Sequence, residues 1–423
     1  MELKINESLK LNLDIPLSRV VDFNMQWRVN DHASLKLRGE LPYEVAIGCQ
    51  SKLLSGSKIV VEYCWDQRVQ VIFNGLIKKI EISYEGSIAQ MQIEGISATW
   101  KMDITRSCRS FQDGNMTYAE LAKRVAGYTE TDVIAVVGKN TKISEPLLQY
   151  QESDWEFMKR VCSHLNKFIL CDVLTGNPAF WFGMRKGGRI ALTTDHSYHC
   201  TIDPILKRKK YIVCSREAYQ IGDRATFLEE DVVILQRDVE FNGETIFTYT
   251  LGSETVLDQN IQYNDNLSGC GLWGIVKEIS GEMLKIQLEI DKDEDCGEYW
   301  FPWYPETGNI MCAMPEIGSL VLLSISGNDE SSAVVSVCLH NENKKDEHYS
   351  NRYLKISDHS LFKLSPDKLE FSKNEGSQAV ALEDGTINIK TDKKIKIEAE
   401  KNIYVKGRSV IIKASEEING VVG

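Results

Sequence analysis

Residues that often bind metal ions lie close together at His196, His199 and Cys200, and Asp195 precedes them. Imidazole and thiolate groups are common zinc ligands, but a zinc site normally draws its ligands from two clusters at a recognisable spacing. The sequence offers no second cluster of that kind. We therefore expect these side chains to pack or to face solvent, and we expect no metal ion or other cofactor.

A run of acidic residues from Asp291 to Asp295 places aspartate at the first, third and fifth positions of a possible calcium-binding loop. Such a loop needs glycine at its sixth position and glutamate at its twelfth. This chain has Cys296 and Pro302 there. The pattern therefore predicts a solvated acidic hairpin rather than a calcium site.

Cys162 and His164 could supply a nucleophile and its base. Successive residues on a helix point about 100° apart, so either group would need a partner from elsewhere in the chain. We interpret Cys162 as a core residue and His164 as a surface residue. The stretch Gly183–Gly188 lacks the Gly-Lys-Ser/Thr ending of a phosphate-binding loop, and the sequence has no Gly-x-Ser-x-Gly motif. We predict no catalytic residues and no enzymatic activity.

The composition is that of a folded protein with an acidic surface. Of 423 residues, 43% are apolar and 26% are charged, and 49 basic against 61 acidic residues give a net charge of −12. A chain with this charge has no overall positive field that would hold nucleic acid. The short basic run Lys207–Lys210 follows Pro204 and predicts a solvated loop, with a docking contact to another subunit as the alternative.

The eleven cysteines include no Cys-x-x-Cys pair, which indicates reduced thiols in a protein made in the cytoplasm. The opening residues Met1–Asn6 alternate polar and apolar side chains, so we expect no signal peptide. The longest uncharged apolar stretches run for about ten residues, which is too short to span a bilayer.

Residues 1–265 predict strands with two helical islands. Alternation predicts strands at Lys58–Tyr63, at Gln70–Phe73 before Asn74-Gly75, and at Ala89–Gly95. Helical spacing predicts one helix from Tyr118 to a stop at Gly127, and a second that is capped by Ser153 or Asp154 and runs to Leu165.

Residues 266–345 predict a small closed barrel. From Cys270 to His340 there are twelve acidic residues and three lysines, so this part carries a charge of 3 − 12 = −9. About seventy residues and five strands suit an OB-type barrel. The predicted strands are Trp273–Ile279, Met283–Ile290, Tyr299–Trp303, Ser319–Ile325 and Ala333–Val337.

Residues 350–423 contain an eight-residue repeat of apolar pairs. The repeats begin at Ile387, Ile395, Ile403 and Ile411, and polar residues separate them. A unit of eight residues cannot bury an apolar pair by itself, so copies must stack. Three chains wound around one axis would pair every strand and place the apolar side chains in a dry seam. The predicted seam residues are Ile387, Ile389, Ile395, Ile397, Ile403, Val405 and Ile411.

This repeat resembles the triple-stranded β-helix of contractile phage tail spikes and of the valine-glycine repeat (VgrG) proteins of type VI secretion. The second segment strengthens the resemblance, since its order of motifs is similar to that of the OB domain of these spikes. The matching residues there are Trp300, Phe301, Pro302, Trp303, Pro315 and Gly318, followed by Gly327–Val335. In the first segment the helix entry resembles that of the hub domain, at Gln151, Glu152, Ser153, Asp154 and Trp155.

The resemblance implies a mainly β homotrimer with an α+β hub. It implies tandem β-barrel hub domains in 1–265, an OB-fold barrel in 266–345 and an intertwined β-helix spike in 350–423. Such a protein would adapt a hexameric inner tube to a trimeric needle in a phage tail, a tail-like bacteriocin or a secretion apparatus, and would pierce a target envelope. The implied partners are the inner tube protein, baseplate wedge proteins and a separate PAAR-type tip protein, because residues 416–423 contain no histidine for a metal-bound tip. The alternatives are a spike-associated wall-degrading enzyme and a glycan-binding tail protein.

Overall fold

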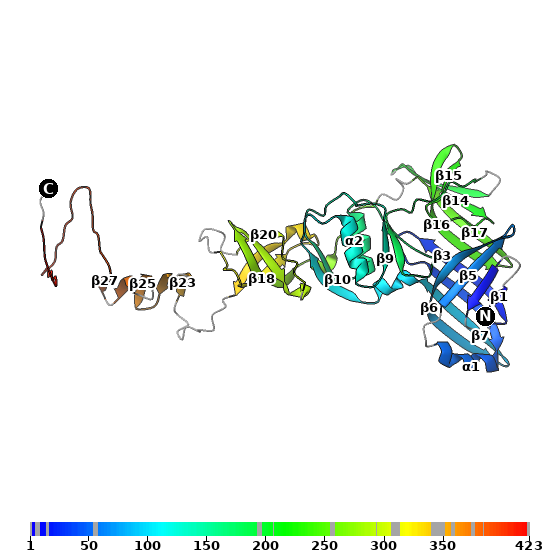
Figure 1. The fold of residues 1–423 in the computed structure, drawn as a ribbon, viewed down its shortest axis with the longest axis horizontal. Coiled ribbons are helices and arrows are strands. Elements are labelled where there is room, and N and C mark those ends of the chain that lie inside the picture. The colour runs from blue at the N-terminus through cyan, green and yellow to red at the C-terminus, as the bar shows by residue number, and fades with distance from the viewer. Residues whose placement is uncertain are drawn as a thin grey trace. The chain divides into compact units, whose positions relative to one another are not determined.

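The computed structural model describes residues 2–4, 9–13, 17–53, 58–192, 197–205, 207–253, 259–292, 294–305, 314–339, 352–356, 360–373, 377–383 and 385–420. The chain divides into two compact units, Met1–Asn341 and Glu342–Gly423. Both units are built mainly from antiparallel strands (Figure 1), which confirms the predicted mainly β fold class. No helix of the described residues is long and apolar enough to cross a membrane.

The first unit contains a twelve-stranded sheet, which lies within the predicted hub region 1–265, and we use the word hub for this region. Helix α1 (Tyr43–Leu53), which the sequence did not predict, follows β4 directly. Alternate residues of most strands from β2 to β17 in this sheet are buried in one large core, so the sheet has an apolar face and a solvated face. Its strands are β1 (Glu2–Lys4), β2 (Leu9–Leu13), β3 (Arg19–Arg28), β4 (Ser34–Pro42), β5 (Lys58–Trp65), β6 (Arg68–Glu85), β7 (Ile88–Ser97), β13 (Tyr198–Asp203), β14 (Arg208–Ser215), β15 (Arg224–Phe227), β16 (Glu230–Asn242) and β17 (Glu244–Gly252).

The strands expected to form two barrels are continuous in this sheet. β3 from the first half of the hub pairs with β16 from the second half, from Arg28 opposite Gln236 to Phe23 opposite Phe241. Arg237, which is 1% exposed, also connects the two halves. Its guanidinium donates to the backbone oxygens of Ile72 at 2.6 Å and Tyr219 at 3.1 Å.

The strand predicted at Gln70–Phe73 continues through Asn74 and Gly75, because both residues lie inside the long strand β6. Asn74 donates its backbone amide to the oxygen of Val173 at 2.7 Å. A Cβ atom at Gly75 would lie 2.4 Å from the oxygen of Ile96. The glycine therefore allows a close approach of two backbones rather than a reversal of the chain.

A small α+β region follows the first seven strands. The two predicted helices are confirmed as α2 (Tyr118–Gly127) and α3 (Asp154–Ser163), and each begins with a capping box. Two small sheets accompany them. They are formed by β8 (Arg106–Phe111) with β10 (Leu147–Ser153), and by β9 (Asp132–Ala135), β11 (Ile169–Cys171) and β12 (Ala179–Phe182).

The five predicted barrel strands are present and form one sheet in the order β20-β19-β18-β21-β22. A parallel bridge between Trp303 and Val335 joins the end of β20 to β22 and closes the sheet into an OB-type barrel. Its core is separate from that of the hub but includes Leu148 of β10. The strands are β18 (Cys270–Ser280), β19 (Met283–Leu288), β20 (Trp300–Pro302), β21 (Leu320–Ile325) and β22 (Val334–Leu339).

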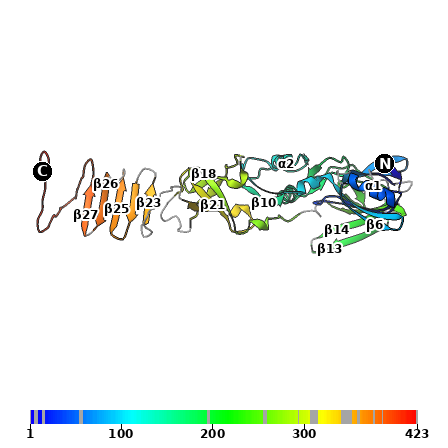
Figure 2. The same cartoon turned by 90° about the horizontal axis from the view of Figure 1, so that it is seen from below.

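The second unit begins with a five-stranded antiparallel meander (Figure 2). No residue described between 391 and 420 belongs to a strand of this single chain. The domain limits 1–265, 266–345 and 350–423 stay predictions. The meander strands are β23 (Arg352–Ile356), β24 (Ser360–Leu364), β25 (Lys368–Lys373), β26 (Gln378–Glu383) and β27 (Thr386–Lys390).

Candidate functional site

The predicted helix-entry motif forms the start of α3. The Ser153 hydroxyl accepts from the backbone amide of Glu156 at 3.0 Å, and the Glu156 carboxylate accepts from the amide of Ser153 at 3.0 Å. Gln151 is the exposed residue of a β-bulge and has a φ of +53°. The bulge and the capping box together change the direction of the chain from strand β10 into the helix.

The last motif residue, Trp155, packs in a buried aromatic and polar cluster. Its ring stacks on His32 with 4.3 Å between centroids, and its indole N–H donates to the oxygen of Asn30 at 3.2 Å. His32 contacts Thr99 through Nδ1 at 2.8 Å and Asp103 through Nε2 at 3.5 Å. The hydrogen bond with His32 lowers the pKa of Asp103.

A hydroxyl, an imidazole and a carboxylate in this order resemble the arrangement of a hydrolase. Thr99 is 0% exposed, so its hydroxyl has no access to a substrate. The cluster of Thr99, His32 and Asp103 therefore supports the packing of α3 against the segment that precedes β8.

Arg160 links the helix-entry motif to the barrel motif. Its Nε and Nη2 donate to the two carboxylate oxygens of Glu152, each at 2.9 Å. Its Nη1 donates to Glu330 at 2.8 Å, and Glu330 also accepts from the amide of Leu148 at 3.0 Å. All three charged residues are buried, so each depends on the others for compensation of its lost hydration. Two separately predicted motifs thus meet at one ionic network.

Two further carboxylates of the barrel contact the hub. Asp291 accepts from the amide and the hydroxyl of Ser110 at 2.5 and 2.6 Å. Glu294 accepts from Arg124 at 2.6 Å and from the Tyr128 hydroxyl at 3.0 Å. The prediction of a solvated acidic hairpin is therefore wrong for Asp291, which is buried, whereas Glu294 is exposed but is bound by hub donors. We call Asp291, Glu294 and Glu330 the joint carboxylates, because they join the barrel to the hub.

The carboxyl pKa values at the hub-barrel joint shift in opposite directions in its buried and its exposed parts. Burial raises the pKa of Asp291 and of Glu152, although the hydrogen bonds to Ser110 and Arg160 oppose this effect. The hydrogen bond from Arg124 lowers the pKa of the more exposed Glu294. The joint carboxylates each have a fixed donor in the hub, which suits a rigid joint between hub and barrel.

The barrel motif residues are structural parts of the barrel. Phe301 and Trp303 are buried in its core, and Trp300 and Pro302 complete β20. Pro315 is buried, and Gly318 has a φ of +85° in the turn before β21. A positive φ favours glycine, which explains that motif position.

Arg160 gives a weak signal in the sequence, because it follows the apolar Phe157 by three residues on α3 and both side chains are buried on that side of the helix. Ser110, Arg124 and Tyr128 give no such signal. Their partners lie more than 160 residues away in the chain, and only the fold brings them together.

The remaining candidates of the sequence are described only in part. His199 is exposed on β13, Cys200 packs against the hub core, and Asp195 and His196 lie outside the described residues. Among the described residues no three potential ligands are close enough to hold a metal ion. The basic run does not form a loop, since Arg208 begins β14 and Lys209 forms an ion pair with Glu230 at 2.7 Å.

Cys162 is buried as predicted, but His164 is not a free surface residue. The Nε2 atom of His164 is buried and has no hydrogen-bond partner. Burial and the nearby Arg160 lower the pKa of His164, while the nearby Glu330 and Asp329 act in the opposite direction.

Acidification should lower the free energy of unfolding through His164, which lies near Arg160 and Glu330 at the hub-barrel joint. Because its folded pKa lies below the ordinary value of 6.5, its contribution to stability is present above that pH and is lost as the pH falls through the folded pKa. Urea unfolding at pH 7.5 and pH 5.5 should show a smaller loss of unfolding free energy for His164→Gln than for the unchanged chain. An equal loss in both proteins would contradict the assignment.

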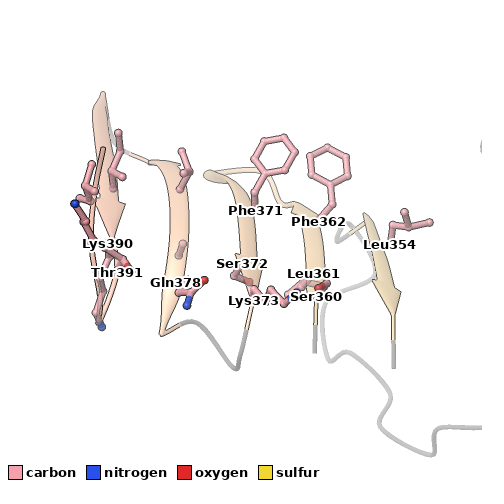
Figure 3. Close-up of a pocket in the computed structure, with 15 residues that line it drawn as sticks. Leu354, Ser360, Leu361, Phe362, Phe371, Ser372, Lys373, Gln378, Lys390 and Thr391 are labelled. Carbon is pink, nitrogen blue, oxygen red and sulfur yellow. The ribbon is translucent and has the colours of Figure 1, made fainter. Parts of the chain in front are cut away.

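The second unit has one strongly apolar sheet face. Cross-strand pairing aligns one residue from each strand of the meander in a single row, and Figure 3 shows Phe362 and Phe371 side by side within it. Their rings stack with centroids 4.7 Å apart. The row borders a groove of about 590 Å³. The row consists of Leu354, Phe362, Phe371, Val380 and Ile389.

The predicted seam residues lie exposed in the single chain. Their side chains are between 51% and 76% exposed, although all of them are isoleucine or valine. This exposure is what a seam between chains would require of the single chain, and the seam itself stays a prediction. These residues are Ile387, Ile389, Ile395, Ile397, Ile403, Val405 and Ile411.

Solved structures share the fold of this chain. An E. coli protein, described as a component of the type VI secretion system with structural similarity to the T4 bacteriophage tail proteins gp27 and gp5, has a TM-score of 0.56 at 11% identity, over 77% of this chain and 98% of its own. A chain of the half-lidded Francisella PdpA-VgrG complex has a TM-score of 0.59 at 9% identity, over 90% of this chain and 88% of its own. The lidless complex gives 0.57 at 10%, over 88% and 93%. The chain therefore has the fold of VgrG-like baseplate hub proteins.

Sequence comparisons add less. A model of the Alg8 N-terminal domain matches residues 39–173, which is less than half of the chain. No curated protein matches the sequence.

Proposed function

We propose that this chain is the central hub and puncturing spike of a contractile injection machine and that it works as a homotrimer. The observation that carries the proposal is the eight-residue repeat of exposed apolar residues that follows a barrel joined to a hub by buried charges. The hub would bind the inner tube, and the second unit would form the needle.

The second unit supplies the surfaces for assembly. Its meander exposes Phe371, Val380 and Ile389 on one face, and the repeats continue this apolar pattern beyond β27. Three copies would place these faces around one axis and exclude water from them, which contributes roughly 25 cal/mol for each Å² of apolar surface buried. A continuous apolar seam of this kind would stiffen the needle along its axis.

The joint carboxylates between hub and barrel suit the transmission of axial force. A barrel held to the hub only by a flexible linker would tilt under load. Here Glu330 and Asp291 hold the barrel at two buried points, and Glu294 adds a third contact. Force applied to the hub would then reach the barrel without a change in their relative orientation.

The expected partners follow from this role. The hub would contact the inner tube protein and the baseplate wedge proteins, and a PAAR-type protein would cover the tip. The chain would act after assembly into a phage tail, a tail-like bacteriocin or a secretion particle.

Co-assembly tests the proposal against both alternatives. When the chain is expressed with the tube and sheath proteins encoded near its own gene, electron microscopy should show it at one end of each tube. Purified protein should clear no peptidoglycan. A chain that stays separate from the tubes would favour the glycan-binding protein, and clearing above a blank would favour the wall-degrading enzyme.

A further inference from the structure

The outside of the barrel carries an apolar surface that spans three neighbouring strands. Trp273 of β18 lies opposite Leu322 of β21, which lies opposite Val337 of β22. A second row joins Ile275, Leu320 and Leu339 in the same way. We call these six residues the outer barrel face. Figure 2 shows β18 and β21, two of the strands that carry them.

The outer barrel face points away from the barrel core. Residues that alternate with it, such as Val276, Val321 and Leu323, are at most 1% exposed and form the core. Ile275 and Leu339 are exposed by 47% and 44%, and the other four members are half-buried. A strand that is apolar on both faces is typical of a strand buried on both faces. In one chain only the inner face is buried.

The outer barrel face carries no charge of its own. All six members of the face are uncharged, although the segment from Cys270 to His340 has a net charge of −9. Glu278 and Lys285 pair near the tip of the β18–β19 hairpin, and the three joint carboxylates contact the hub. Barrels with this charge would repel each other if their acidic surfaces met. The six residues of the outer barrel face add no such repulsion.

We propose that the outer barrel face packs against the barrels of two further copies around a threefold axis. This inference rests on the proposed homotrimer and adds the barrel surface through which the copies meet. Twelve residues, 340–351, separate Leu339 at the end of β22 from β23. A barrel that meets its copies through β22 would therefore deliver all three chains close to the axis at which the spike begins.

Photo-crosslinking tests this contact in the full-length protein. A benzoylphenylalanine at position 275 should give adducts between chains on irradiation, whereas the same group at position 279 on the same strand should not. Ile279 is a matched control, because it is also exposed, at 36%, but lies outside the face. The mass of the same sample is measured by light scattering.

The outcomes separate this inference from the proposed function. Adducts at position 275 and none at 279, in a sample with the mass of three chains, would support the contact. A three-chain mass without adducts at 275, or with equal adducts at both positions, would overturn the contact and leave the trimer standing. A one-chain mass would overturn both.

A pair of charged variants gives an independent test. Ile275→Asp should raise the concentration at which the trimer dissociates by at least tenfold, because the carboxylate would be buried without a partner. Ile279→Asp should leave that concentration unchanged. Equal effects of the two substitutions would contradict the outer barrel face as the contact.

Discussion

Replacing both Ile395 and Ile403 with aspartate should leave the full-length protein as single chains of 48.0 kDa. In the proposed needle these positions from three copies share one dry seam, so the double variant would bury six carboxylates without partners. Such a cost exceeds what the apolar contacts of the repeats can offset. Light scattering at micromolar concentration measures the mass directly.

The repeat itself supplies the control. Lys396 and Tyr404 follow the two isoleucines in the sequence, and alternation along a strand points them away from the seam. Lys396→Asp with Tyr404→Asp should therefore keep the mass of three chains. Loss of the trimer in both variants would indicate a general effect of charge, and its retention in both would exclude the isoleucine seam.

Replacing Arg160 with alanine should lower the free energy of unfolding by about 3–5 kcal/mol, because it leaves buried Glu152 and Glu330 without their cation. It also removes the donor to the oxygen of Leu148. Urea unfolding of the full-length protein at pH 7.5 measures the loss.

Arg106 is a matched control for this variant. It pairs with Glu156 at 2.8 Å, but its side chain is 56% exposed. Exposed pairs contribute at most about 1 kcal/mol, so Arg106→Ala should change stability little. Adding Glu330→Gln to Arg160→Ala should restore part of the loss, since it removes one uncompensated charge. Similar losses for the two arginine variants, or no recovery in the double variant, would contradict the buried network.

Local patterns predicted most of the elements. The spacing of Tyr118, Leu121 and Val125 predicted α2, and the capping residue Ser153 predicted the start of α3. The barrel strands followed from alternation alone, because each has one face in a small core. These signals are local, and the structure confirms them where local periodicity and burial agree.

The errors arose where distant parts of the chain decide. Asn74 and Gly75 follow the predicted strand Gln70–Phe73, but Val173, which lies outside any strand, and Ile96 of β7 approach them, and both residues are part of β6. Asp291 and Glu294 belong to an acidic run that suggests a solvated loop. Their donors, Ser110 and Arg124, can be found only once the fold is known.

The repeat differs from both cases. The sequence shows the spacing of Ile395, Ile403 and Ile411, but in one chain these side chains are exposed and the segment 391–420 forms no strand. Its expected structure depends on other copies. The seam residues of the spike therefore stay a prediction until the assembled form is measured.

The mass of the unchanged protein in solution tests the hub-and-spike proposal most directly. Three chains of 48.0 kDa predict 144 kDa by light scattering, and this mass should persist on dilution to micromolar concentration. A mass of 48.0 kDa at that concentration would contradict the trimer and the needle built from it.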